Sequence, residues 1–323
     1  MSGQIAVKPY ARRFCEPLRT ARGSWALRKG FLLRVEREGG YGYGEVAPLP
    51  EFGSETVSSA EAFLEALEAS PDLAVPDDLP CCAFALSAAR LPRPSLRSYS
   101  VSGLLSAGAE ALGQSAQKLA AGYRSLKWKI GVAPIEEELR IAERLLKSLD
   151  GGVRVRFDAN GSLSTAQLES WLAVLGQFPG QVDYLEQPLP CGEEAVMQRY
   201  LEASGVEIAL DESLNGPDGQ RWMAPGAWSG PLVIKAPLMG DVVKLAERLE
   251  PVARQVVLSS VFETGVGLEN SLRIADSLAA VHRPIGFDTM HAFDDALSPL
   301  VSEPEICVEA RRAYTPEQIW NLI

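Results

Sequence analysis

Hydrophobic and polar positions follow two different patterns along the chain. Within the first 95 residues, short apolar runs at positions 31–36 and 41–46 predict two β-strands. Gly39 and Gly40 lie between these runs, and because glycine accepts positive φ they favour a tight antiparallel hairpin. Helical spacing of apolar residues follows, so this part is predicted to be an α+β unit. The two predicted helices cover residues 57–68 and 79–90.

Beyond a proline-rich segment at residues 91–94, short apolar runs alternate with longer stretches of helical spacing. Eight such units indicate a parallel (β/α)8 barrel. An open doubly wound sheet is the alternative, although no glycine-rich phosphate loop follows the first run to support its dinucleotide-binding form. The eight predicted strands cover residues 98–104, 126–130, 153–157, 182–185, 208–210, 232–234, 256–260 and 285–287.

The composition is that of an ordinary folded protein. Of 323 residues, 46% are hydrophobic and 23% are charged, which excludes a disordered chain, a coiled coil and a collagen-like fibre. The net charge of −11 gives no basic face of the kind that binds nucleic acid or an anionic membrane. The apolar runs are too short to span a bilayer, and residues 1–14 lack the apolar core of a secretory signal. We therefore expect a small-molecule partner, and the oligomeric state is left open.

Five cysteines and two histidines narrow the chemistry further. The odd number of cysteines and the lack of a Cys-x-x-Cys pair argue against a disulfide framework and favour a reduced, cytoplasmic protein. Two histidines cannot supply a three-histidine zinc site. A serine–histidine–aspartate triad is allowed by number, but no Gly-x-Ser-x-Gly motif supports one.

Acidic residues follow three successive predicted strands of the barrel. Asp158, Glu186 and Asp211 each come directly after an apolar run, and Arg156 and Asn160 share a strand face with Asp158. Because barrel active sites lie at the carboxyl ends of the strands, these carboxylates are expected to converge. They would repel one another without a cation between them, and hard oxygen ligands suit Mg²⁺, with Mn²⁺ as a substitute. Each carboxylate alone has the alternative of a helix cap or a surface ion pair.

Lysines follow the second and the sixth predicted strands. Side chains two apart in a strand face the same way, so Lys127 and Lys129 are expected to point together. Like charges disfavour the protonated form, so each lysine is predicted to lower the pKa of the other, and a lysine near neutrality can act as a general base. Lys235 follows an apolar run and is expected to enter the same site from across the barrel. The alternative for the pair by itself is a solvated strand end.

Taken together, these segments make the chain resemble the enolase superfamily over nearly its whole length. They are typical of its muconate-lactonizing-enzyme-like subgroup, in which lysine is the base. Within that subgroup the chain is most similar to the o-succinylbenzoate synthase family, because of the amino-acid sequence at residues 44–56 and 258–268. The motifs of the subgroup are Lys127-Trp128-Lys129, Arg156-Phe157-Asp158-Ala159-Asn160, Leu185-Glu186-Gln187-Pro188, Leu210-Asp211-Glu212-Ser213 and Ile234-Lys235-Ala236-Pro237.

The resemblance implies a modified (β/α)8 TIM barrel over residues 96–300 and an N-terminal α+β capping domain over residues 1–95. A C-terminal segment, residues 301–323, would return to the cap, whose loops at 19–24 and 49–56 would close over the barrel mouth. The implied activity is that of a Mg²⁺-dependent hydro-lyase. It would convert 2-succinyl-6-hydroxy-2,4-cyclohexadiene-1-carboxylate into o-succinylbenzoate, an intermediate of menaquinone or phylloquinone biosynthesis.

The resemblance also implies a role for each charged residue, in the lysine-and-Mg²⁺ mechanism already established for enolase-superfamily sites. Lys129 would remove the proton α to the substrate carboxylate and then protonate the departing hydroxyl. Lys235 would stabilise the enediolate from the opposite face, and Lys127 would orient the carboxylate and tune Lys129. The implied Mg²⁺ ligands are Asp158, Glu186 and Asp211. The implied substrate contacts are Arg156, Asn160, Ser259 and Ser260.

Two other functions stay open on the sequence. A dipeptide epimerase or N-acylamino-acid racemase would use Lys129 and Lys235 as two bases on opposite faces of the same scaffold. Residues 286–289 lack the Asp-x-Asp pattern typical of the dipeptide epimerases, which favours the synthase. The second alternative is a barrel that binds a carboxylate without turnover. The intact set of lysines and carboxylates disfavours it, because such charges are costly to keep in a protein interior.

Overall fold

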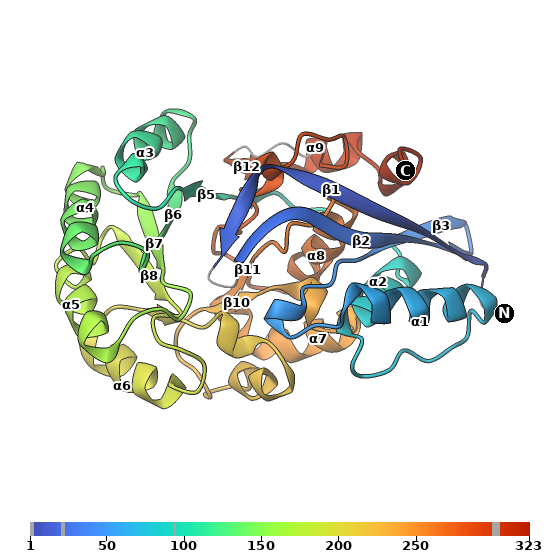
Figure 1. Cartoon of the computed structure of the whole chain (residues 1–323), viewed down its shortest axis with the longest axis horizontal. Helices are drawn as coiled ribbons and strands as arrows, with labels where there is room; N and C mark the ends of the chain where they lie inside the picture. The colour runs from blue at the N-terminus through green and yellow to red at the C-terminus, as the bar shows by residue number, and fades with distance from the viewer. Residues whose placement is uncertain (1–2, 21–22, 94, 299–303) are drawn as a thin grey trace.

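The computed structural model describes residues 3–20, 23–93, 95–298 and 304–323. Figure 1 shows an antiparallel sheet with its helices beside a set of parallel strands that helices surround. The predicted α/β class, a (β/α)8 barrel with an α+β cap, is confirmed. The predicted cap loop at 19–24 includes residues 21–22, which lie outside the described residues.

The cap is built on a three-stranded antiparallel sheet in the order β1-β2-β3. β1 (Ile5–Thr20) and β2 (Gly23–Arg37) form a long ribbon, and β3 (Gly40–Val46) pairs with the second half of β2. The predicted hairpin between β2 and β3 is confirmed. Gly39 and Gly40 both have the positive φ that this turn requires.

The hydropathy pattern does not predict β1. Its alternate residues Tyr10, Arg12 and Phe14 are buried. Arg12 pairs with Asp295 and donates to the carbonyl of Glu263, so a charged residue occupies an interior position. A buried arginine interrupts the apolar alternation by which a half-buried strand is recognised.

Two helices and a 3-10 turn complete the cap. α1 (Val57–Ala69) and α2 (Pro80–Arg90) lie close to their predicted bounds, and α2 packs against β3. The turn η1 (Pro50–Phe52) lies at the mouth of the barrel. Cys81 and Cys82 on α2 are buried in the cap core. All five cysteines lie in the described part of the chain, and each is a free thiol.

The barrel strands follow the predicted alternation and pair in parallel. Five form one sheet in the order β5-β6-β7-β8-β9, and β10 pairs with β11. The eighth predicted strand, residues 285–287, is present only as bridging residues that help to close the barrel. The closing bridges are Leu210 to Leu232, Ser259 to Gly286 and Val101 to Ile285. The strands are β5 (Ser102–Leu105), β6 (Ser125–Lys129), β7 (Arg154–Asp158), β8 (Val182–Glu186), β9 (Ile208–Ala209), β10 (Leu232–Ile234) and β11 (Val256–Leu258).

Helices cover the outside of the barrel (Figure 1). One of them begins with a capping box, in which the side chains of Ser164 and Gln167 each accept the other's backbone N–H. The helices are α3 (Glu110–Ala120), α4 (Ile135–Ser148), α5 (Thr165–Leu175), α6 (Glu194–Ser204), α7 (Val242–Leu249) and α8 (Gly265–Ser277). The 3-10 turns are η2 (Glu212–Leu214), η3 (Pro217–Met223), η4 (Ala236–Leu238), η5 (Glu250–Gln255) and η6 (Met290–Ala292).

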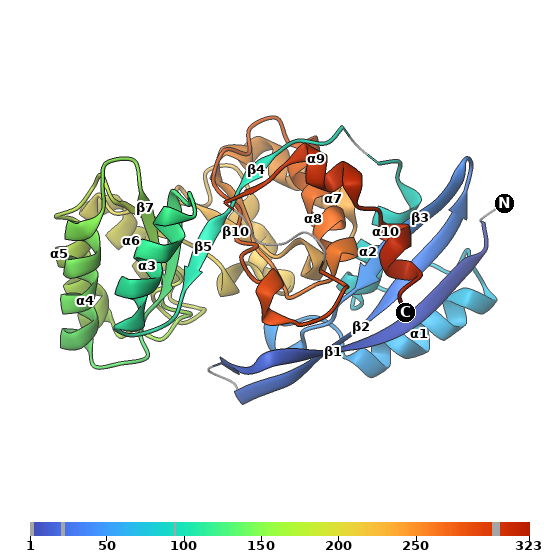
Figure 2. The ribbon, with the colours of Figure 1, turned by 90° about the horizontal axis from the view of Figure 1, so that it is seen from above.

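The C-terminal segment lies beside the cap. β12 (Glu305–Ile306) pairs antiparallel with β4 (Tyr99–Ser100), and α9 (Val308–Ala313) and α10 (Pro316–Trp320) follow. Figure 2 shows these two red helices next to the blue cap strands. Lys8 in β1 donates to the backbone carbonyl at the end of α10, with 2.9 Å between Nζ and O.

Candidate active site

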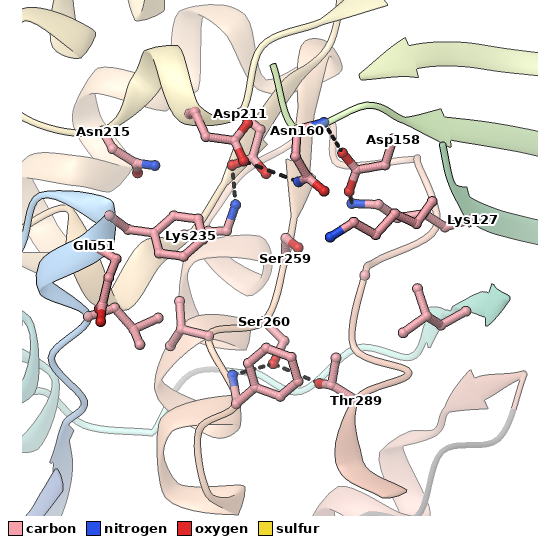
Figure 3. A pocket seen from close by; sticks show the side chains of 18 of the residues that line it. Glu51, Lys127, Asp158, Asn160, Asp211, Asn215, Lys235, Ser259, Ser260 and Thr289 are labelled. Carbon is pink, nitrogen blue, oxygen red and sulfur yellow. Dashed lines mark hydrogen bonds and ion pairs between the residues drawn. The ribbon is translucent and has the colours of Figure 1, made fainter. Parts of the chain in front are cut away.

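A cavity of about 540 Å³ opens at the carboxyl ends of the barrel strands, beside η1 of the cap. Figure 3 shows Lys127 and Asp158 on one side of it and Lys235 with Asp211 on the other. Most of the residues predicted from the sequence line this cavity. They are Lys127, Lys129, Asp158, Asn160, Asp211, Lys235, Ser259 and Ser260.

Strand pairing explains how the charged residues of the first strands meet. In the register of β6, β7 and β8, Asp158 is opposite both Lys129 and Glu186. The Nζ of Lys127 lies 2.9 Å from Oδ2 of Asp158 and 2.7 Å from Oε1 of Glu186. One ammonium group therefore bridges two of the carboxylates that were predicted to bind metal.

Glu186 is fully buried and does not line the cavity. Its Oε2 atom has no hydrogen-bond partner among the described residues. Burial and the nearby charge of Asp158 raise the pKa of Glu186 well above its usual value. At Asp158 burial also acts to raise the pKa, but the ammonium of Lys127 outweighs it and the pKa is lowered. A cation next to the unpartnered oxygen of Glu186 would stabilise its ionised form.

The sequence predicts that Lys127 and Lys129 lower each other's pKa, and for Lys127 this prediction is wrong. Burial does lower the pKa of this lysine, but the charges of Asp158 and Glu186 outweigh burial and raise the pKa well above its usual value. The carboxylates in contact with Lys127 therefore matter more than the neighbouring lysine. Lys127 stays protonated, and it can orient a carboxylate but cannot accept a proton.

Lys235 reaches the cavity from the opposite side of the barrel (Figure 3). Its ammonium pairs with Asp211 and lies 5.0 Å from the centre of the Phe52 ring in η1. Burial lowers the pKa of Lys235, but Asp211 and Glu212 outweigh burial and raise it. A lysine that stays protonated here can stabilise negative charge that develops on a substrate.

Lys129 is the third lysine of the cavity, and its side chain is partly exposed. Within the described residues its ammonium group makes no ion pair or hydrogen bond, whereas Lys127 and Lys235 are both paired. An amine without an ion pair can lose its proton without leaving a buried carboxylate unpaired. Lys129 is therefore the lysine best placed to act as a general base.

Arg156 is a predicted substrate contact that the structure does not bring to the cavity. Its guanidinium is buried, and its Nε lies 2.8 Å from Oδ2 of Asp183. It shares a strand face with Asp158 as predicted, but it lies one pleat earlier, about 7 Å along the strand. That offset places Arg156 inside the barrel below the site, where it holds adjacent strands together.

Ser260 lines the cavity, but its hydroxyl is already engaged by the protein. It donates to Oε2 of Glu263 over 2.6 Å, and it accepts from Oγ1 of Thr289 at 2.8 Å and from N of Phe262 at 2.9 Å. Its proton is therefore not free for a substrate. Ser259, the adjacent predicted contact, lines the same wall.

Backbone strain is concentrated at the barrel mouth. Among the described residues, the non-glycine residues with positive φ are Asn160, Gln187 and Phe262, which follow β7, β8 and β11. Gln187 is held in its conformation by hydrogen bonds of its own side chain. Its Oε1 accepts the N–H groups of Asp211 and Ser213 at 3.0 and 3.1 Å. Such conformations persist where the surrounding structure fixes them, often at functional sites. Gln187 thereby fixes the backbone at Asp211.

Two arginines of the cap hold the loop after β11. Arg12 donates to the carbonyl of Glu263, with 2.8 Å between Nη1 and O, and Arg28 donates to the carbonyl of Val261, with 3.0 Å between Nε and O. Phe262 between these two carbonyls lines the cavity. The cap therefore shapes one wall of the site, which the sequence motifs of the barrel do not indicate.

Several cavity residues go beyond those predicted. Glu212 accepts from Nδ2 of Asn160 at 3.2 Å, and burial, with the charge of Asp211, raises its pKa to about 7. Asn215 and Phe52 also line the cavity. Adjacency to Asp211 is a sequence signal for Glu212. No sequence signal identifies Phe52, because the docking of the cap decides its position.

The donor set fits Mg²⁺. Asp158, Glu186 and Asp211 offer hard oxygen atoms, the ligands this ion prefers, and one buried oxygen of Glu186 has no partner in the described ranges. In the described part of the chain, no three His, Cys, Asp or Glu side chains are already grouped as a metal site. The ammonium groups of Lys127 and Lys235 lie against these carboxylates instead. The three carboxylates are the residues that could hold the ion once the lysines turn toward substrate.

Two family models match the chain. A model described as "Enolase C-terminal domain-like" matches residues 111–318, and one described as "MenC, N-terminal domain" matches residues 18–92. The chain is 36% identical over 294 residues to the o-succinylbenzoate synthase of Thermosynechococcus vestitus, covering 86% of this chain and 90% of that protein. It is 30% identical over 274 residues to that of Pectobacterium atrosepticum, covering 81% and 83%.

Solved structures show the same relationship. An o-succinylbenzoate synthase from Thermosynechococcus elongatus BP-1, complexed with Mg in its active site, matches with a TM-score of 0.82 and 31% identity. The match covers 99% of this chain and 100% of that one. The L-Ala-D/L-Glu epimerase of Bacillus subtilis matches with a TM-score of 0.77 at 19% identity, covering 91% and 92% of the two chains. That likeness shows the shared fold alone.

Proposed function

The chain belongs to the enolase superfamily, within its o-succinylbenzoate synthase family, and from this premise we propose how its own residues carry out the reaction. It is a Mg²⁺-dependent lyase that removes water from 2-succinyl-6-hydroxy-2,4-cyclohexadiene-1-carboxylate and forms o-succinylbenzoate. The product is an intermediate of menaquinone or phylloquinone biosynthesis. The reaction breaks the C–H bond α to the ring carboxylate and the C–O bond of the ring hydroxyl, and the ring becomes aromatic.

Lys129 is the general base of this proposal. Its neutral amine takes the proton α to the carboxylate, and the resulting ammonium returns a proton to the departing hydroxyl, so one molecule of water leaves and Lys129 is regenerated. The observation that carries the assignment is that Lys129 has no ion pair within the described residues, while Lys127 and Lys235 have. A positioned base of this kind contributes about 10²–10⁴-fold to the rate.

The other two lysines remain protonated and act electrostatically. Lys235 faces the developing negative charge from the side of the cavity opposite Lys127 (Figure 3). Lys127 donates to the substrate carboxylate and fixes the α-proton in reach of Lys129. Both contacts are stronger in a cavity that excludes water than they are in solution.

Asp158, Glu186 and Asp211 would hold Mg²⁺, on the fit of their oxygen atoms described above. When bound, the ion stabilises negative charge on the substrate carboxylate. Asn160 and Ser259 are proposed as substrate contacts, because both line the cavity. Ser260 is proposed as a positioning residue, since its hydroxyl proton is given to Glu263.

The test is to mix the purified protein with the cyclohexadiene substrate and to follow aromatisation in the ultraviolet, first with Mg²⁺ and then with EDTA. We expect rapid conversion that EDTA abolishes and added Mg²⁺ restores. No conversion by a folded, Mg²⁺-loaded protein would overturn the assignment. A preparation with Lys129→Ala under the same conditions controls for contaminating activity.

Epimerisation of dipeptides or racemisation of N-acylamino acids is the alternative on this scaffold. The epimerase structures of Bacillus subtilis and Methylococcus capsulatus are 19% and 22% identical to the chain, which shows only a shared fold. A racemase would exchange the α-hydrogen of an amino-acid derivative in D₂O, and we expect no such exchange to compete with synthase turnover. A non-catalytic carboxylate-binding barrel would convert none of these compounds.

We also propose the division of the chain into a cap of residues 1–95, a barrel of residues 96–300 and a returning segment of residues 301–323. The change from antiparallel to parallel pairing after α2 supports the first boundary. The contact of Lys8 with Trp320 supports the return to the cap. The boundary at 300 lies outside the described residues.

A cytoplasmic location and a small-molecule carboxylate substrate, with the oligomeric state left open, complete the proposal. The free thiols support a reducing compartment. No helix of the described residues has the length and apolar character needed to cross a bilayer. The net charge of −11 disfavours a nucleic-acid partner.

A further inference from the structure

Asn215 presents an unsatisfied carboxamide to the wall of the cavity. It follows η2, and its backbone N–H donates to the carbonyl of Glu212 over 3.2 Å. Both Nδ2 and Oδ1 of its side chain are buried, and neither has a hydrogen-bond partner within the described chain. Figure 3 shows the side chain beside Lys235 and Asp211. A buried amide without partners is destabilising, and in native proteins it needs a reason.

A loop of the cap approaches the residue next to Asn215. A Cβ built on Gly53, directly after η1, would lie 3.7 Å from the backbone N of Gly216, the residue after Asn215. The two loops are therefore nearly in contact at this point. Glu51 and Phe52 of η1 line the same cavity as Asn215. The seam between cap and barrel thus lies beside a polar group that has no partner within the described residues.

The surrounding charges indicate what could pair with the carboxamide. Glu51 and Glu212 line the same cavity, and Oε2 of Glu212 is likewise buried without a hydrogen-bond partner among the residues that the structure describes. The ammonium of Lys235 is already paired with Asp211, so the further acidic side chains Glu51 and Glu212 make this part of the wall a poor place for an anionic group. An uncharged acceptor oxygen can receive a hydrogen bond from Nδ2 of Asn215 without that repulsion.

We propose that Asn215 binds the ketone oxygen of the substrate's succinyl chain, an inference that rests on the proposed function. Of the substrate's four oxygen-bearing groups, the ring carboxylate is held at the reacting end and the ring hydroxyl leaves beside Lys129. The distal carboxylate is negative. The ketone is the one uncharged acceptor that is left, and Nδ2 of Asn215 donates to it.

The test compares two ligands that differ only at this oxygen. Calorimetry measures binding of o-succinylbenzoate and of 2-(3-carboxypropyl)benzoate, in which a methylene replaces the ketone, to the Mg²⁺-loaded wild type and to Asn215→Ala. The expected result is about a tenfold loss of affinity for o-succinylbenzoate in Asn215→Ala, with little change for the methylene compound. Asn321→Ala, at an exposed asparagine after α10, is the matched control.

Two results would overturn the proposal. Equal losses for both ligands would assign Asn215 to another group, such as the distal carboxylate. No loss for either would mean that water satisfies the carboxamide. A failure of the proposed function would be seen separately, as absence of turnover by the wild type in the aromatisation assay.

A second variant separates binding from structure. Asn215→Leu replaces two unpartnered polar atoms with apolar ones of similar volume, so we expect the ligand-free enzyme to melt at the same or a higher temperature. Its affinity for o-succinylbenzoate should fall as in Asn215→Ala. A residue that serves only the fold would give the opposite pattern, a lower melting temperature with unchanged affinity.

Discussion

Glu45 of cap strand β3 accepts the backbone N–H of Thr264 at the start of barrel helix α8, with 3.0 Å from N to Oε1. The same carboxylate accepts the Thr264 hydroxyl, the N–H of Gly267 at 2.8 Å and the hydroxyl of Tyr10 at 2.6 Å. A cap carboxylate therefore satisfies the N–H groups at the start of a helix in the barrel. This relationship fixes the cap on the side of the cavity where the loop after β11 lies.

Replacing this carboxylate should weaken the joint between cap and barrel. In Glu45→Gln one acceptor oxygen becomes an NH₂ group that faces N–H donors. We expect the free energy of unfolding to fall by about 2–3 kcal/mol, because hydrogen bonds to a charged group are lost and buried donors are left unsatisfied. Urea denaturation followed by circular dichroism measures this change. Glu61→Gln, at an exposed position of α1, is the control, and equal stability of the two variants would contradict the assignment.

Lys129→Ala should abolish turnover while the fold is kept. Loss of the proposed base should lower kcat by about 10²–10⁴-fold. The aromatisation assay gives kcat, and circular dichroism and Mg²⁺ binding by calorimetry show that the rest of the site is intact. Lys147→Ala, at an exposed lysine of α4, should retain wild-type activity. Retained activity in Lys129→Ala would disprove its role as the base.

The enzyme should need more Mg²⁺ when one of the proposed ligands is removed. Asp211→Asn removes one anionic oxygen donor, so we expect both a lower kcat and a requirement for about tenfold more Mg²⁺. Activity measured across a range of Mg²⁺ concentrations after EDTA treatment tests this. Asp218→Asn, at an exposed aspartate of η3, is the matched control. An unchanged Mg²⁺ requirement in Asp211→Asn would remove Asp211 from the ligand set.

Glu263 should make stability depend on pH. Burial raises its pKa to about 7 from the usual 4.5, so between these pH values the folded state holds a proton that the unfolded state has lost. Its contribution to stability is full below about pH 4.5 and is lost as the pH rises through about 7. Glutamine does not titrate. The unfolding free energy of Glu263→Gln should therefore rise, relative to wild type, by up to about 1.4 kcal/mol per pH unit in that interval.

Urea denaturation of both proteins from about pH 5 to about pH 8 tests this prediction. Only the difference between them counts, because other groups, Glu212 among them, titrate in the same range in both proteins. A difference that is flat across the interval would show that Glu263 is ionised throughout. Glu61→Gln, at an exposed position of α1, is the control variant.

The sequence by itself determined the barrel and the place of its carboxylates. The parallel strands of a barrel send their carboxyl ends to one mouth, so an apolar run followed by Asp158 or Asp211 specifies a position in the site without knowledge of any contact. Because successive side chains of a strand point to opposite faces, the two-residue spacing likewise put Lys127 and Lys129 on one face. These features depend on local periodicity and on the topology that it implies.

Only the tertiary structure decided which of those residues are free to act. Lys127 and Lys129 are equivalent in the period-two pattern, where only the family resemblance tells them apart. The carboxylates of neighbouring strands engage Lys127 and leave Lys129 without an ion pair within the described residues. Arg156 shares a strand face with Asp158, and only the structure shows that it pairs with Asp183 instead of reaching the cavity. The place of Asn215 in a cavity shared with Phe52 depends on the docking of a cap loop that is distant in the sequence. Such contacts between remote segments are set by packing, and no local pattern of hydrophobic and polar residues encodes them.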